Sequence, residues 1–109
     1  MEPILLVMSN LPDRDSALEL AHSLVKARLA ACVNVLAQVT SVYRWKGEVE
    51  TATEVPVLIK TRESLFPRVE EAIRRMHPYE LPEVVAVPIT AGLAAYLEWV
   101  AFETTPTPV

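Results

Sequence analysis

The sequence predicts an α+β fold in which an antiparallel sheet carries helices on one face. Three observations predict it: a short apolar run follows the N-terminus, two later stretches repeat their apolar residues at helical spacing, and a long run of β-branched and aromatic residues lies between those stretches. The 109 residues suit a single domain, residues 1–109, whose core is limited because a chain of this length buries only about 65% of its unfolded surface. Oligomerisation could add to this burial.

The first strand is predicted over residues 4–9, a continuous apolar run that ends at the turn residues 10–12. A helix follows, because Asp13 or Asp15 can cap its N-terminus and apolar residues then recur at helical spacing to about Leu29. The apolar positions are Ala17, Leu20, Ala21, Leu24 and Val25. We therefore expect this helix to bury one face and to leave the other in water.

A long β-hairpin is predicted next, with arms at residues 32–45 and 48–62 and a turn at Lys46 and Gly47. Each arm approaches 14 residues, whereas the commonest strand length is about 5 to 6, so the far end of the hairpin should project from so small a domain. Pro56 lies inside the second arm and has no N–H to donate, which predicts that the strand changes partner there.

The last third of the chain is predicted to hold a helix, a strand and a second helix. Ser64 can cap the first of these helices, which ends at His77 because a residue before proline avoids the α region. A strand is expected over residues 81–89, with prolines near its ends, and Gly92 opens the last helix. Residues 104–109 are expected to form a frayed, flexible tail.

This order, β-α-β-β-α-β with an added C-terminal helix, predicts the ferredoxin-like arrangement. One sheet face and the overlong hairpin would then be exposed, and both are liabilities for a monomer. We therefore expect the hairpins to pair between subunits of a homo-oligomer.

Composition excludes several classes of protein. The formal net charge of −4 would repel a phosphate backbone, so no nucleic-acid partner is expected. Two glycines 45 positions apart cannot form a dinucleotide-binding or P-loop motif. A single cysteine allows no intrachain disulfide and favours a reducing compartment, and the N-terminal apolar run is too short for a signal peptide or a membrane span. A cytoplasmic location without a membrane contact is therefore expected.

Four separated stretches carry a resemblance to a known family. They read LAACVN (29–34), SVYRWKGEVE (41–50), VPVLIKT (55–61) and HPYELPEVVAVPI (77–89), followed by Tyr96, Leu97 and Trp99. In order and spacing they resemble the CutA divalent-ion tolerance proteins, over about residues 4–100. The resemblance implies a ferredoxin-like fold, a trimer with strands paired between subunits, and a link to tolerance of copper and other divalent ions. It also implies a likeness to the trimeric PII signalling proteins, and no reaction is established for the family.

The candidate metal ligands are His77, Met76, Met8 and Cys32. Imidazole suits copper and zinc, and the proline after His77 fixes its backbone at a helix end. In some bacterial relatives a cysteine and a second histidine, the proposed copper ligands, stand where this chain has Met8 and Met76. This departure counts against a Cu(II) site of that kind, whereas a thioether-imidazole set would suit Cu(I). The cysteine of the LAAC motif is Cys32. Alternatively the methionines fill the core, Cys32 is a small buried residue, and His77 interacts with the helix dipole.

A second candidate site is a cleft between neighbouring subunits. Glu48, Glu50 and Glu54 share one face of their strand, which predicts either a solvated charged face or a polar cleft. The resemblance places the following residues around that cleft, together with His77: Tyr43, Trp45, Glu54, Lys60, Tyr79, Glu80 and Glu83. Such a set could bind a small anion or metabolite, or it could only hold subunits together.

No assembled nucleophile, base and orienting acid is visible in the sequence, so an enzyme is not expected. The leading hypothesis is a cytosolic homotrimer that binds copper or another divalent metal ion and contributes to metal tolerance. The alternative is a PII-like signalling or scaffold trimer whose cleft holds a small ligand and whose surface meets a protein partner. A third hypothesis is a trimer whose motif residues serve assembly only.

Overall fold

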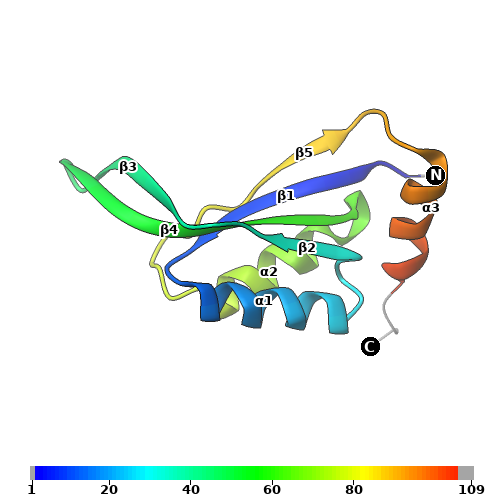
Figure 1. Cartoon of the computed structure of the whole chain (residues 1–109), viewed down its shortest axis with the longest axis horizontal. Helices are drawn as coiled ribbons and strands as arrows, with labels where there is room; N and C mark the ends of the chain where they lie inside the picture. Colours follow the sequence, from blue (N-terminus) through cyan, green and yellow to red (C-terminus); the bar gives the residue numbers. More distant parts are fainter. Residues whose placement is uncertain (1, 106–109) are drawn as a thin grey trace.

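Five strands form one sheet in the computed structural model, which describes residues 2–105 (Figure 1). They are β1 (Ile4–Leu11), β2 (Cys32–Val35), β3 (Val39–Trp45), β4 (Glu48–Arg62) and β5 (Val85–Ile89). Helices α1 (Arg14–Lys26) and α2 (Phe66–Met76) cover one face, a short 3-10 turn η1 (Glu63–Leu65) precedes α2, and α3 (Ala94–Glu103) lies at one end of the sheet.

The strand order is β2-β4-β1-β5, with β3 paired to the other half of β4, and every pairing is antiparallel. Strand β4 lies between β1 and β2, and strand β1 lies between β4 and β5. Each βαβ unit is therefore split by a strand from elsewhere in the chain. This is the ferredoxin-like arrangement, and the predicted fold class is confirmed.

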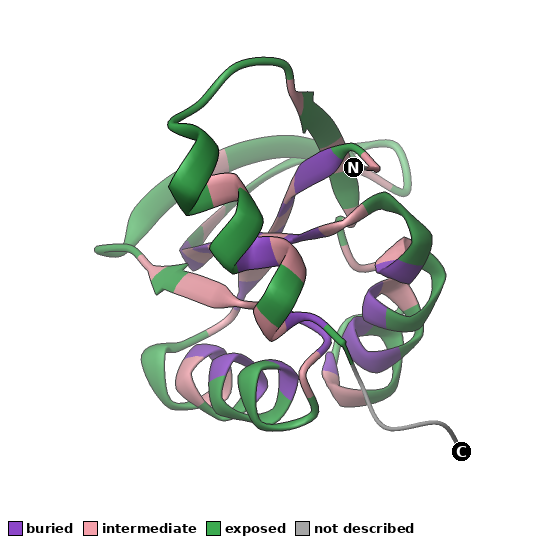
Figure 2. Cartoon of the chain, turned by 90° about the vertical axis from the view of Figure 1, so that its right-hand side faces the viewer, coloured by how far each residue is buried: buried purple, intermediate pink, exposed green. Residues whose placement is uncertain are grey.

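The core lies between the sheet and the two helices that cover it. Alternate residues of the central strands point into it, among them Val7 of β1 and Ile59 of β4, and both are fully buried. Leu24 of α1 and Ile73 of α2 meet them from the other side. In Figure 2 the two lower helices turn their buried residues inward and their exposed residues outward. Each such side chain stabilises the fold by about 1.5–3 kcal/mol relative to exposure.

The first strand and helix are confirmed, with shifted ends. Strand β1 continues to Leu11, which is buried in the core rather than part of a turn. Of the two candidate caps, Asp13 is the N-cap of α1: its carboxylate accepts from the Ser16 N–H at 2.8 Å. The helix ends at Lys26, before the predicted end, because Arg28 takes a left-handed backbone with φ of 60° and turns the chain back to the sheet.

The hairpin prediction is right for the second arm and wrong for the first. Strand β4 runs unbroken for 15 residues and changes partner at Pro56 as predicted, from β3 as far as Glu54 to β2 from Val57 onward. The first arm is not one strand, because β2 and β3 are separated at residues 36–38. There the Leu36 N–H donates to the Pro56 carbonyl at 3.0 Å, so the break lies beside the proline.

Four predictions for the last third of the chain are corrected. Ser64 does not cap α2: it lies in η1, and its N–H and hydroxyl both donate to the Glu2 carboxylate. Strand β5 begins at Val85, so residues 81–84 are not a strand, and α3 begins at Ala94 rather than at the glycine. The predicted tail includes Thr104, which is fully buried; its residues 106–109 lie outside the described residues.

A network of hydrogen bonds joins the N-terminus, the end of β4 and the end of α3. Arg62 donates to the Glu2 carboxylate at 3.1 Å and, through Nε, to the Thr104 carbonyl at 2.9 Å. Glu2 also accepts from Ser64, and these contacts hold the pKa of the Glu2 carboxyl below its ordinary value of 4.5, with the Ser64 N–H the largest cause. Arg28 likewise donates to the Phe102 and Glu103 carbonyls, so two arginines satisfy the carbonyls at the C-terminal end of α3.

The far half of the hairpin projects from the rest of the chain (Figure 1). The radius of gyration is 14.5 Å, whereas a compact chain of this length is expected at about 13 Å. Apolar residues of this ribbon face water, including Val42 and Val49, each about two-thirds exposed. No helix in residues 2–105 is long and apolar enough to cross a membrane.

Replacing Thr61 with Val should destabilise the fold. Thr61 is fully buried, and its hydroxyl donates to the Leu29 carbonyl at 2.6 Å, so Val keeps the shape and removes the donor. We expect a loss of about 1–2 kcal/mol in the free energy of unfolding, measured by urea denaturation. The same change at the exposed Thr90 is the control and should have little effect; equal effects at both sites would contradict this account.

Replacing Glu2 with Gln should remove a pH-dependent part of the stability. Because the folded-state pKa of Glu2 lies below its unfolded value, this contribution is present above about pH 4.5 and is lost as the pH falls through the folded-state value. We expect the variant to be less stable by about 1 kcal/mol at pH 7 and the difference to vanish in acid. Denaturation at pH 7 and pH 3 tests this, and a pH-independent difference would refute it.

Candidate functional site

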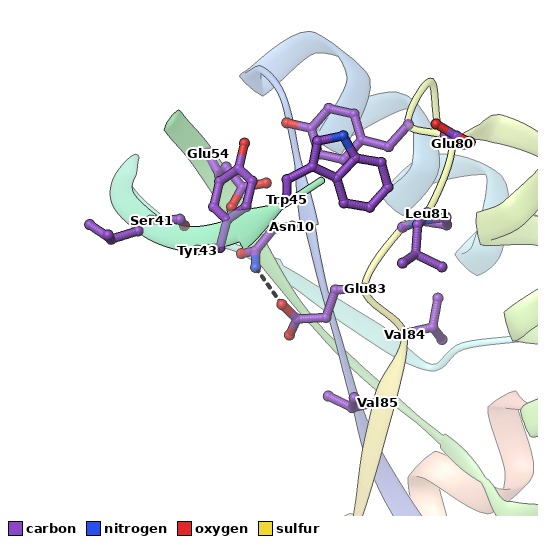
Figure 3. Close-up of a pocket in the computed structure, with 13 residues that line it drawn as sticks. Asn10, Ser41, Tyr43, Trp45, Glu54, Glu80, Leu81, Glu83, Val84 and Val85 are labelled. Atoms are coloured by element: carbon purple, nitrogen blue, oxygen red, sulfur yellow. Dashed lines mark hydrogen bonds between the residues drawn. The ribbon is translucent and has the colours of Figure 1, made fainter. Parts of the chain in front are cut away.

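A cavity of about 780 Å³ lies along one face of the projecting hairpin (Figure 3), and we call it the hairpin cavity. Strand β3 and the adjoining part of β4 form one side, and the segment between α2 and β5 forms the other. Six of the seven cleft residues expected from the resemblance line it: Tyr43, Trp45, Glu54, Tyr79, Glu80 and Glu83. Asn10, Ser41, Val42 and residues 81, 82, 84 and 85 complete the lining.

Two different kinds of local structure place these side chains. Tyr43 and Trp45 are two residues apart on β3, so they share one face of that strand. The segment after α2 has no regular structure, and His77 anchors it. The His77 ring is buried, its Nε2 lies 2.5 Å from the Asn10 carbonyl oxygen, and its Nδ1 accepts from the Tyr79 N–H at 3.2 Å. Because Nδ1 accepts, Nε2 carries the proton and donates.

Asn10 ties the two sides of the hairpin cavity together. It lies near the end of β1 opposite Pro56, where β4 changes partner. Its carbonyl accepts from His77, and its side-chain amide donates to Glu83 at 3.0 Å, the contact drawn as a dashed line in Figure 3. Asn10 therefore holds the segment after α2 against the end of β1.

Three carboxylates face the hairpin cavity, and each has a different environment. Glu80 is exposed and lies 3.5 Å from the Lys46 ammonium. Glu83 accepts from an amide. Glu54 is only 8% exposed and forms no ion pair within residues 2–105. The cavity therefore carries net negative charge, and its most buried carboxylate has no cation of its own.

The Tyr79 phenol has its pKa raised above the ordinary value of 10.0, first by burial and then by the negative charge of Glu54. A phenol is neutral at pH 7 even at its ordinary pKa, and the raised pKa of Tyr79 keeps its proton in place further into the alkaline range. This places a hydrogen-bond donor beside the buried carboxylate.

The four residues predicted to bind metal do not form one cluster. His77 has both ring nitrogens engaged in hydrogen bonds, so no free lone pair faces a metal. Met76, the last residue of α2, packs against the core. Cys32 lies opposite Lys60, which lies opposite Leu6 of β1, so Cys32 and Met8 are two strands, or about 10 Å, apart across the sheet. Among the described residues no three His, Cys, Asp or Glu side chains are grouped to hold a metal ion.

Lys60 is the cleft residue that the structure places elsewhere. It is six residues from Glu54 along β4, a distance of about 20 Å. Its ammonium donates to Asn34 at 3.1 Å and lies 5.7 Å from the centre of the Tyr96 ring of α3. The sequence analysis did not identify Asn10 as a site residue, because it assigned residues 10–12 to a turn. The only sequence feature that pointed to Asn10 was its position directly after an apolar run.

A protein-family model described as CutA1 divalent ion tolerance protein matches residues 5–103. Protein CutA of Mus musculus is 48% identical over 89 residues, which are 82% of this chain and 50% of that protein. The divalent-cation tolerance protein CutA of Thermus thermophilus is 43% identical over 99 residues, 91% of this chain and 94% of that protein. This chain thus spans about half the length of the mouse relative and of the human relative.

Solved structures agree with this similarity. The crystal structure of CutA1 from Oryza sativa superposes with a TM-score of 0.93 at 40% identity, over 97% of each chain. The divalent cation tolerance protein from Thermus thermophilus superposes with a TM-score of 0.91 at 42% identity, over 93% of this chain and 98% of that one. Fold and sequence therefore point to the same family.

Replacing Glu54 with Gln should lower the pKa of Tyr79 toward 10.0, because the variant removes a negative charge that disfavours the phenolate. Burial remains, so the pKa should stay above that value. Titration of carbon-13-labelled tyrosine by NMR measures it, with Glu19→Gln on the exposed face of α1 as the charge-matched control. A Tyr79 pKa that is unchanged by Glu54→Gln would contradict the arrangement described.

Proposed function

The chain belongs to the CutA1 divalent ion tolerance protein family, and on this basis we propose that it binds a divalent metal ion, with copper the first candidate, and contributes to tolerance of such ions. The observation that carries the proposal is the acid-lined hairpin cavity, in which the buried carboxylate of Glu54 lacks a cation among residues 2–105. A cation held there would offset the cost of burying that charge.

We propose that the working form is a homotrimer. The far half of the hairpin is a two-stranded ribbon with both faces in water, and such a ribbon is at best marginally stable alone. Apolar residues are exposed along it, and others are exposed on β5 and α3, including Val87, Trp99 and Phe102. Contact with further copies would bury these residues and would cover the free edges of the sheet.

The metal is proposed to lie between subunits. One chain contributes the carboxylates of Glu54 and Glu83 at the hairpin cavity, and a neighbouring copy supplies the remaining ligands. Oxygen ligands of this kind suit hard divalent ions better than Cu(I), which prefers thiolates and thioethers. A Cu(I) site would instead use Cys32 and Met8 from different copies, and His77 would serve as the residue that positions the cavity wall rather than as a ligand.

We further propose a cytoplasmic, non-catalytic protein. The single cysteine fits a reducing compartment, and no grouped nucleophile and base lines the hairpin cavity among the described residues.

A second candidate function is a PII-like role, in which the hairpin cavity of the trimer holds a small organic ligand. Its volume of about 780 Å³ lies within the range of about 300–1,000 Å³ that is typical of small-molecule sites. Three aromatic side chains in its lining favour this candidate, because they offer apolar walls that a bare metal ion does not use.

Native mass spectrometry during titration with Cu(II) and Zn(II) tests the leading proposal. We expect a trimer that takes up metal in defined steps, and about tenfold weaker uptake in Glu54→Gln but not in the control Glu19→Gln. If Cys32→Ser abolishes metal uptake and Glu54→Gln leaves it intact, the metal binds at the Cys32 thiol instead. A monomer, or a trimer without uptake, would refute the proposal.

A further inference from the structure

We propose that Lys60 of a second copy of the chain pairs with Glu54, so that an ion pair which one chain cannot form is made between copies. This inference rests on the homotrimer proposed above, and it names the residue that the neighbouring copy contributes to the hairpin cavity.

Glu54 and Lys60 lie on the same face of the sheet, which α1 and α2 do not cover. Those two helices pack on the face that carries Val57 and Ile59 of β4. Because successive side chains of a strand point to opposite faces, Glu54, Leu58 and Lys60 share the other face, which we call the open face. The register of the sheet adds apolar residues of β1 and β5 to the open face: Leu6, Met8, Val85 and Val87.

The carboxylate of Glu54 has a neutral partner and no cation within its own chain. The side chain is 8% exposed, and the phenol of Tyr79 hydrogen-bonds to it. Glu54 forms no ion pair within residues 2–105. A carboxylate buried to this degree is stabilised further when a positive charge lies beside it. Tyr79 therefore satisfies part of the hydrogen bonding of Glu54 and leaves its charge uncompensated.

The ammonium of Lys60 is in the converse position. It donates to the side-chain oxygen of Asn34 at 3.1 Å and lies 5.7 Å from the centre of the Tyr96 ring, and both groups are neutral. Lys60 forms no ion pair within residues 2–105. An ammonium has three donors, so Lys60 can keep its contact with Asn34 and donate to a carboxylate as well.

Lys60 is the cation that the open face offers to a second copy. Arg62 shares this face, but its guanidinium is already paired with the Glu2 carboxylate at 3.1 Å. Lys46 at the hairpin turn lies beside Glu80. Most of the other lysines and arginines lie on the helices that cover the opposite face: Arg14, Lys26, Arg68, Arg74 and Arg75.

The two residues can meet only between copies. They are six residues apart on one unbroken strand, about 20 Å, so no side-chain rotation joins them within a chain. Contact between the Glu54 end of one open face and the Lys60 end of the next brings unlike charges together and covers apolar residues between them. Complementary charges of this kind fix the register of an interface. Because the contact joins different ends of the face, it can repeat around a closed ring.

Charge reversal tests the pair, with the association of the full chain measured by sedimentation equilibrium in EDTA. We expect Glu54→Lys and Lys60→Glu each to weaken association at least about tenfold, because each brings like charges together. The double variant should restore most of the association. Since the two positions lie far apart in one chain, such a restoration can arise only between copies. Glu54→Lys combined with Lys26→Glu on α1 is the charge-matched control and should restore nothing.

Neutral variants keep the proposal testable if a reversed charge prevents folding. In the cycle of Glu54→Gln, Lys60→Met and the double variant, we expect the second substitution to cost at least about tenfold less once the first is present. Additive effects in a chain that still forms a trimer would overturn the pair and leave the trimer in place. A monomeric chain would overturn both. Metal uptake is measured separately, so its absence would refute the metal proposal and leave this one standing.

Discussion

Strand β4 runs unbroken through two environments, the water around the projecting hairpin and the core of the domain, and the rest of the structure depends on that constraint. Its second half, from Val57 to Arg62, lies between β1 and β2 and sends alternate residues into the core. Its first half pairs with β3 alone and projects into water. The change occurs at Pro56, where the missing N–H makes a continuous ladder on both sides impossible. The core half fixes the strand, and the strand in turn holds the ribbon away from the domain.

One end of the hairpin cavity lies where these two environments meet. Glu54 is the last residue of β4 that pairs with β3, and Asn10 lies opposite Pro56 on the other side. Asn10 accepts from His77 and donates to Glu83, so the segment after α2 is held against the point where β4 changes partner. Glu54 and Asn10 therefore form the inner end of the candidate site, and the contacts of Asn10 bring the segment after α2 to it.

The sequence predicted the elements because their signals are local, and it failed where a contact joins distant segments. Helical spacing, the Asp13 cap and the proline in β4 all act within a few residues of themselves. The role of Ser64 depends on Glu2, which is 62 residues away, and no local pattern records that contact. His77 was predicted as a metal ligand from its imidazole, the proline that follows it and the family resemblance. No local pattern records that the Asn10 carbonyl, 67 residues away, engages its ring. Six of the residues that the resemblance placed around a cleft between subunits line one cavity of the single chain, and the cleft between subunits stays a prediction.

A buried carboxylate without an ion-pair partner connects the proposals for assembly and metal. Glu54 is 8% exposed, and its neighbour within residues 2–105 is the Tyr79 phenol, which donates a hydrogen bond but carries no positive charge. Burial of a charged group is unfavourable unless an opposite charge or further hydrogen-bond donors compensate it. A neighbouring subunit and a metal ion can each supply positive charge, but they need different surroundings. A metal ion needs several oxygen, nitrogen or sulfur ligands at short range, and no three His, Cys, Asp or Glu side chains among the described residues are grouped to provide them, so a metal ion at Glu54 needs a second subunit to complete its shell.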